Sequence, residues 1–265
     1  MSALSLAARD SSTMLRRNLL HARRYPSLTL NLLLTPIMLL LLFVYIFGDT
    51  MSAGIAGGAG RSHYIAYVVP GILLMTIGST VIGAAVSVAT DMSEGIIARF
   101  RTMAIHRGSV LVGHVIGSVL QSVASVVLVG AVAVAIGFRS TDATALEWLA
   151  AFGLLALFSL ALTWIAVGMG MASPNAEAAG NAAMPLILLP LLSSAFTPID
   201  AMPGWIQPIA EYQPFTPAIE TLRGLLLGTA IGDNWWIALA WCLALAVLGY
   251  RWSTASFHRE PRQSA

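Results

Sequence analysis

The sequence predicts an all-α polytopic membrane protein with six transmembrane helices. Hydrophobic residues make up 57% of the chain and charged residues only 10%, and the mean hydropathy is +0.80. A helix needs about 20 apolar residues to cross a bilayer, and only helices or closed barrels satisfy their backbone hydrogen bonds in lipid. Six apolar stretches, nearly free of ionisable side chains, are the predicted spans: residues 27–47, 65–89, 110–137, 147–172, 182–196 and 235–250.

The spans and their connectors use nearly all 265 residues, so we expect a single transmembrane domain over 1–265 without a separate soluble domain. Residues 1–26 form a basic tail in which Arg16, Arg17, Arg23 and Arg24 alternate with apolar residues up to Pro26. This pattern predicts an amphipathic helix at the membrane interface. A basic flank that sets the topology explains the same arginines, and the two interpretations are compatible.

The distribution of arginines predicts that both termini are cytoplasmic. In this orientation the inner side holds Arg9, Arg16, Arg17, Arg23, Arg24, Arg99, Arg101, Arg107, Arg251, Arg259 and Arg262, and the outer side holds Arg61, Arg139 and Arg223. Such an excess of positive charge in the short inner loops is the ordinary signal of orientation.

Residues 91–108, between the second and third spans, form a predicted cytoplasmic coupling segment. The run from Asp91 to Glu94 resembles a helix-starting capping box. Beyond it, four apolar side chains share one face of a helix, with basic side chains beside them; the apolar residues are Ile96, Ile97, Phe100 and Met103, and the basic ones are Arg99, Arg101 and Arg107. A short helix of this kind suits docking onto a soluble partner. The alternative is a basic anchor that only fixes topology.

Residues 197–232, on the outer side, contain five prolines yet remain apolar. Pro203 and Trp205 lie in one predicted helix start, and Pro214 precedes a second helix that we expect to begin at Thr216–Pro217 and to stop near Gly228. Two apolar helices too short to span predict a re-entrant or interfacial hairpin, and an ordinary outer loop is the alternative. Glu220 and Arg223 are three residues apart and are placed to pair.

The smaller connectors give two further expectations. Residues 173–180 are predicted to form a tight inner turn, and Pro185 and Pro190 are predicted to kink the fifth span.

Several classes of function are disfavoured by what the chain lacks. All 14 basic residues are arginine, so the lysine of a phosphate-binding Walker A loop is missing and any ATP must be bound by another polypeptide. The histidines are scattered without metal-ligand spacing, and we expect no carboxylate beside them in a span; His114 is expected to be an interfacial residue. Ion-coupled carriers keep charges inside their helices. An uncharged interior instead suits apolar or amphipathic cargo and an external energy source.

The chain resembles type-2 ABC exporter permeases, of the branch that includes daunorubicin-resistance permeases and bacterial glycan or lipid exporters. The resemblance rests on Tyr67–Gly71 at the predicted opening of span two and on the blocks 91–113 and 196–228. Two positions depart from the family pattern: Gln213 stands where asparagine is usual, and Ala104 stands where the coupling segment usually has proline.

The resemblance implies a permease subunit in a bacterial plasma membrane, paired with a second copy or a paralogous permease and powered by a separate ATPase that binds ATP and magnesium. The permease itself would be no enzyme and would hold no cofactor, metal or nucleic acid. The coupling contacts would be Glu94, Ile97, Arg99, Phe100, Arg101 and Arg107, and the outer gate would include Pro203, Trp205, Pro214, Glu220 and Arg223.

Family dimers meet near spans one and five, so cargo would pass there, and a drug or antibiotic is the expected cargo. A lipid or glycan exporter of the same architecture and an ATP-independent channel or scaffold are the alternatives.

Overall fold

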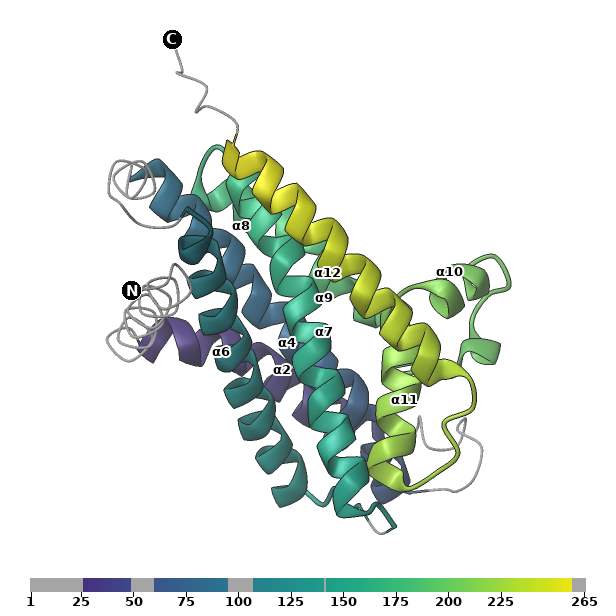
Figure 1. Cartoon of the computed structure of the whole chain (residues 1–265). Helices are drawn as coiled ribbons and strands as arrows, with labels where there is room; N and C mark the ends of the chain where they lie inside the picture. Colours follow the sequence, from purple (N-terminus) through teal and green to yellow (C-terminus); the bar gives the residue numbers. More distant parts are fainter. Residues whose placement is uncertain (1–25, 49–59, 95–106, 141, 259–265) are drawn as a thin grey trace.

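The computed structural model describes residues 26–48, 60–94, 107–140 and 142–258, and within these ranges the chain is helical with no strand (Figure 1). The elements are α2 (Pro26–Leu42), η1 (Phe43–Phe47), α4 (Arg61–Ser93), α6 (Arg107–Ala135), α7 (Ala145–Ala172), α8 (Ala176–Ala183), α9 (Pro185–Leu188), η3 (Leu189–Leu192), η4 (Ile199–Ala201), α10 (Gln207–Tyr212), α11 (Phe215–Leu227) and α12 (Asn234–His258). The predicted all-α polytopic fold is confirmed.

Four of these helices, α4, α6, α7 and α12, are long and apolar enough to cross a membrane. The first predicted span is the continuous helical run of α2 and η1, and the fifth is present as the shorter apolar helical segment Ala176–Leu192. The predicted interfacial helix in residues 1–26 lies outside the described residues except for Pro26, where α2 begins.

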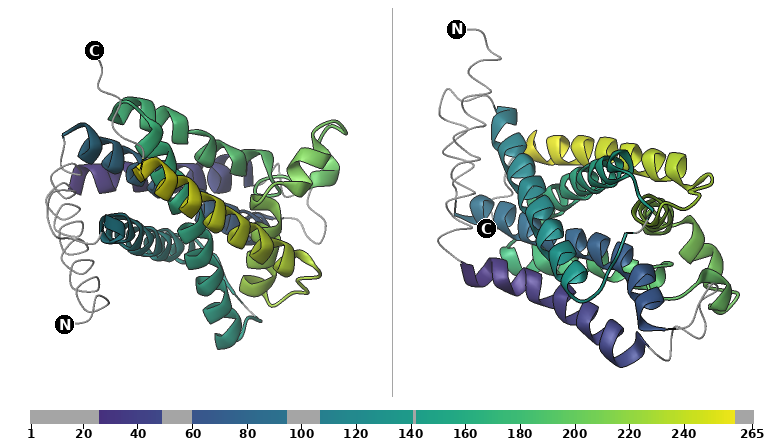
Figure 2. Two further views of the ribbon diagram at one scale, coloured as in Figure 1. Left: turned by 45° about the horizontal axis from the view of Figure 1, so that its top comes forward. Right: turned by 90° about the horizontal axis from the view of Figure 1, so that it is seen from below.

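Helix α4 is the centre of the bundle and packs against α2, α6, α7, α8 and α11 (Figures 1 and 2). Within an 18-residue apolar stretch of each helix, 78% of the residues are buried in α4 and 61% in α7, but only 33% in α6 and 22% in α12. Helices α6 and α12 therefore keep a broad apolar face directed away from the rest of the bundle. Since lipid is as apolar as leucine, close packing rather than burial from water holds such helices together.

Two glycines of α4 let the fifth span approach its backbone. A Cβ atom built on Gly71 would lie 2.5 Å from the Cβ of Ala195, and one built on Gly78 would lie 2.6 Å from the carbonyl oxygen of Leu186. Real side-chain atoms do not tolerate such distances, so the approach requires glycine at both positions. Small residues at a helix–helix contact serve this purpose in membranes.

The fifth predicted span is irregular. It begins at Ala176, earlier than predicted, because the side chain of Asn175 caps the backbone N–H of Ala178 at 2.8 Å. The expected turn over 173–180 is therefore shorter than predicted. The predicted effect of the prolines is confirmed, since Pro185 starts the separate helix α9 and Pro190 lies in the 3-10 turn η3. The helical part ends at Leu192 rather than at residue 196.

Replacing Gly78 by alanine is expected to lower the free energy of unfolding by about 1–3 kcal/mol, the usual cost of overpacking a tight contact. Gly153 is the matched control, since a Cβ built there meets no atom within 4 Å. Gly153→Ala should be neutral or slightly stabilising, because alanine favours a helix. Thermal unfolding in detergent compares the two, and equal melting temperatures would contradict the packing argument.

Candidate functional site

The predicted coupling segment connects the end of α4 to the start of α6. Helix α4 continues through Ser93, and the N–H of Glu94 donates to the carbonyl oxygens of Thr90 and Met92. The expectation that residues 91–94 start a new helix as a capping box is therefore wrong: Asp91 lies in the last turn of α4. Val88, Ala89 and Asp91 are buried against neighbouring helices, so helix packing overrides the local capping signal.

The predicted coupling residues divide into two groups. Glu94 is exposed immediately after α4, and Arg107 is the first residue of α6, so the two stand at opposite ends of the connection. Ile97, Arg99, Phe100 and Arg101 lie outside the described residues. The coupling role of all six residues stays a prediction.

A buried acid–histidine pair lies just inside this connection. The Nε2 atom of His114 on α6 lies 3.0 Å from Oδ2 of Asp91 on α4, and both side chains are less than a tenth exposed. The expectation that no carboxylate accompanies a histidine in a span is wrong at this position. Asp91 and His114 are 23 positions apart, which hides the pairing from a sequence pattern. An acid at the end of one span and a histidine near the start of the next were nevertheless a usable signal.

Around this pair, four long helices meet in a small hydrophobic cluster separate from the main core. Its buried members come from α4, α6, α7 and α12; they are Val88, Leu111, Val115, Val167, Met171 and Phe257. A polar contact in apolar surroundings must be kept, because removing one partner leaves the other buried without it. The pair thus holds the two helices that carry the coupling segment in one relative position.

The outer segment folds as two short helices, α10 and α11, which Figure 1 shows beside the end of the bundle opposite the coupling segment. Both starts differ from prediction. Pro203 and Trp205 precede α10, which begins at Gln207, and α11 begins at Phe215 after Pro214 rather than at Thr216–Pro217. The Thr216 hydroxyl does not cap α11; it donates to the carbonyl oxygen of Ala210 and so joins the two helices. The predicted end at Gly228 is confirmed, with φ of 67°.

Arg223 on α11 connects the outer hairpin to two spans. Its Nη2 atom donates to the carbonyl oxygens of Ser194 at 2.8 Å and of Tyr67 at 3.2 Å, and its guanidinium carbon lies 3.9 Å from the centre of the Tyr67 ring. The predicted pair with Glu220 is present through Nη1. Only 12% of the Arg223 side chain is exposed. A planar cation with five donors is suited to join several acceptors at once.

Further bonds attach the hairpin to the irregular end of the fifth span. The Nε2 atom of Gln213 donates to the carbonyl oxygen of Leu192 at 2.6 Å, and the N–H of Ser194 donates to the Thr216 hydroxyl at 3.4 Å. These side chains bind backbone groups that lose their helical partners where the span unwinds. Gln213, which departs from the family pattern, thus retains a structural role.

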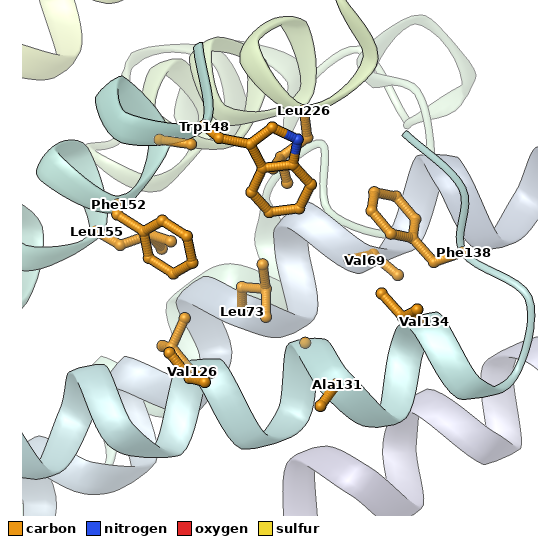
Figure 3. A pocket seen from close by; sticks show the side chains of 13 residues that line it. Val69, Leu73, Val126, Ala131, Val134, Phe138, Trp148, Phe152, Leu155 and Leu226 are labelled. Atoms are coloured by element: carbon orange, nitrogen blue, oxygen red, sulfur yellow. The ribbon is translucent and has the colours of Figure 1, made fainter. Parts of the chain in front are cut away.

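An apolar cavity of about 230 Å³ lies between α4, α6, α7 and the end of α11 (Figure 3). Figure 3 shows Trp148 and Leu226 at one side of it and Val126, Ala131 and Val134 of α6 along another. No sequence signal pointed to this cavity. Among the described residues, no group of three potential metal ligands occurs at any site.

The comparisons with known proteins place the chain in a family. Residues 10–227 match the family described as "ABC-2 type transporter", which is most of the chain. The chain therefore belongs to the ABC-2 type transporter family, and it is a membrane subunit of an ABC exporter.

Its relatives are resistance permeases. The chain is 27% identical over 248 residues to the daunorubicin resistance ABC transporter permease protein DrrB1 of Streptomyces coeruleorubidus, which covers 93% of this chain and 84% of that protein. It is 22% identical over 190 residues to the probable doxorubicin resistance ABC transporter permease protein DrrC of Mycobacterium tuberculosis, strains CDC 1551 and H37Rv, over 67% of this chain and 68% of that protein.

Two of the three blocks that carry the resemblance meet in space. Tyr67 contacts Arg223, and Gly71 lies against Ala195, directly before the outer block. The Tyr67–Gly71 block does not open span two as predicted, because α4 already begins at Arg61.

Asp91→Leu and His114→Leu should each lower the free energy of unfolding by up to about 3–5 kcal/mol, the cost of breaking a buried pair. The double variant Asp91→His with His114→Asp restores the contact with its members exchanged, and it should recover part of this loss. Thermal unfolding of all variants in detergent gives the interaction free energy between the two side chains. A double variant no more stable than Asp91→His or His114→Asp alone would contradict the contact.

Arg223→Lys should lower the free energy of unfolding by about 2–3 kcal/mol. Lysine keeps the positive charge but lacks the planar guanidinium group that contacts Tyr67, Ser194 and Glu220 together. Hydrogen exchange around Ser194 should rise. Glu220→Gln is the control: it keeps an acceptor for Arg223 and leaves both backbone contacts, so its effect should be smaller. Equal effects of the two variants would show that the backbone contacts contribute little.

Proposed function

We propose that this chain, with a separate ATPase, exports an amphipathic or hydrophobic compound of the drug or antibiotic type from a bacterial cell. The observation that carries the proposal is the similarity over 93% of the chain to a permease named for daunorubicin resistance. The second relative, named for doxorubicin resistance, supports the same class of cargo.

The chemistry of the spans supports a cargo of this class. Where the helices are described, ionisable side chains of the spans lie toward the helix ends, as Asp91, His114 and Glu147 do. Such an interior gives no relay for protons or sodium ions, which charged side chains would form in a coupled carrier. The driving energy then comes from outside the chain, and the missing lysine directs ATP binding to a partner.

In the proposed mechanism the ATPase docks on residues 91–108, with Glu94, Arg99, Arg101 and Arg107 as polar contacts and Ile97 and Phe100 as the apolar contact. Closure of two ATPases on ATP displaces the two segments, and the displacement passes into α4 and α6 at the Asp91–His114 pair. The cargo path runs between two permease copies near spans one and five, and the outer hairpin with Pro203, Trp205, Pro214, Glu220 and Arg223 closes its outer side. ATP favours the open path to the extent that it binds that state more tightly.

The first test is co-purification of the tagged chain in mild detergent from cells that express the neighbouring genes. Wild-type protein should retain an ABC-type ATPase, and a Glu94→Ala, Arg99→Glu double variant should lose it. Glu177→Ala is the matched control, since it removes an exposed carboxylate from the other predicted inner turn. Loss of the ATPase from the control as well would contradict docking at residues 91–108.

The transport test uses cells loaded with daunorubicin. Wild-type protein with its ATPase should lower the retained drug, and the double variant should retain drug at the level of cells without the transporter while its abundance in the membrane is unchanged. An ATPase that co-purifies without any effect on daunorubicin would favour the lipid or glycan exporter. Absence of any ATPase would favour the channel or scaffold.

A further inference from the structure

The apolar cavity between α6 and α7 is the part of the molecule that the proposed export path does not use. Its walls come from α4, α6, α7 and α11, and about half of its lining residues are buried, including Leu73, Val126, Ala151 and Leu226. The proposed path between permease copies follows the first and fifth spans, which contribute no lining residue. The cavity is therefore separate from the proposed path.

The cavity opens to the lipid-facing surface. Three of its lining side chains are also among the exposed apolar residues of the bundle: Val127 is 51% exposed, Val134 46% and Phe152 39%. They come from α6 and α7, so the mouth lies between these two spans. Both helices are apolar enough to cross a membrane, and the medium at the mouth is hydrocarbon.

The lining decides what chemistry the cavity accepts. All lining side chains are hydrocarbon except for Trp148, whose indole N–H is the one polar side-chain group (Figure 3). A ligand rich in hydroxyl, amino or carbonyl groups would lose its hydrogen bonds to water there without replacement. An engineered apolar cavity of about 150 Å³ takes up benzene, so 230 Å³ accepts a somewhat longer piece of hydrocarbon.

A cation lies next to the mouth. Arg139 is exposed and directly follows Phe138, a lining residue. Its Nη1 atom donates to the carbonyl oxygens of Val134 and Phe138, which fixes the guanidinium at the end of α6. Guanidinium groups bind phosphate well. A hydrocarbon slot with a cation at its membrane-boundary end matches an anionic phospholipid.

We propose that this cavity binds one acyl chain of an anionic membrane phospholipid, inserted between α6 and α7 with its headgroup beside Arg139. The bound chain fills the space between α4, α6 and α7. It also contacts Leu226 at the end of α11, whose carbonyl oxygen accepts a hydrogen bond from Ser140 at 2.6 Å. The lipid is thus a structural ligand of the outer end of the bundle and not the transported cargo.

The test uses the full chain in nanodiscs that contain phosphatidylglycerol with a photoreactive diazirine in one acyl chain. Mass spectrometry after illumination should find label on Val126–Val134 and on Trp148–Leu155. Gly130→Leu fills the cavity, since a Cβ built on Gly130 meets only Leu73, at 3.9 Å. This variant should lose label at these positions by about tenfold or more, because several methylene groups lose their site.

Two controls separate the cavity from the general lipid surface. Gly153→Leu makes the same substitution at an exposed position of α7 that does not line the cavity, and it should keep the wild-type label. Leu243 and Leu248 on the exposed face of α12 should be labelled equally in every variant. Gly130→Ala adds a single carbon without a clash and should lose part of the cavity label. This variant replaces Gly130→Leu in the test if the leucine variant does not fold.

Three results would overturn the proposal. They are absence of label in the cavity of the wild-type protein, the same label in Gly130→Leu as in Gly153→Leu, and displacement of the label by doxorubicin at concentrations that leave the α12 label unchanged. The last result would assign the cavity to cargo. None of these results depends on the ATPase, so the proposed function and the lipid site fail separately.

Discussion

The contact between α4 and the broken fifth span is the constraint on which the outer half of the molecule depends. Gly71 and Gly78 let the backbone of the fifth span lie against α4, where any side chain would collide with Ala195 or Leu186. The fifth span cannot remain a regular helix there, because Pro185 and Pro190 remove two backbone donors. The helical part also ends at Leu192, so the carbonyl groups there and beyond need other donors, since lipid offers none. Arg223 and Gln213 of the outer segment supply them at Ser194 and Leu192.

This requirement explains why a short, proline-rich outer segment has a defined structure. A hairpin of helices with 6 and 13 residues has little stability by itself. It is held because its polar side chains satisfy backbone groups of a span that it packs against, and because Phe215 places its ring 5.1 Å from that of Phe158. The unwound span and the hairpin therefore stabilise each other, and neither is expected to persist without the other.

The sequence predicts most of the architecture because long apolar helices leave a strong signal in composition and periodicity. It also predicts the Glu220–Arg223 pair, which is local to one helix, and the end of α11 near Gly228. It does not predict the Asp91–His114 pair or the cavity, because both depend on how α4, α6 and α7 are placed side by side. The predicted helix start at residues 91–94 is wrong for a related reason. A capping pattern is a local preference, and the packing of α4 outweighs it.

Helix α4 runs from the outer hairpin to the predicted coupling segment. Its Tyr67 contacts Arg223 of the outer hairpin, and its Asp91 pairs with His114 beside the coupling segment. These residues are 24 positions apart, which is about 36 Å along a helix. A buried helix of this length moves largely as one body, because the packed side chains around it have few alternative arrangements. A displacement at the inner end is therefore expected to reach the outer hairpin through α4 itself. The polar contacts at both ends fix the rotation of α4 about its axis as well as its depth.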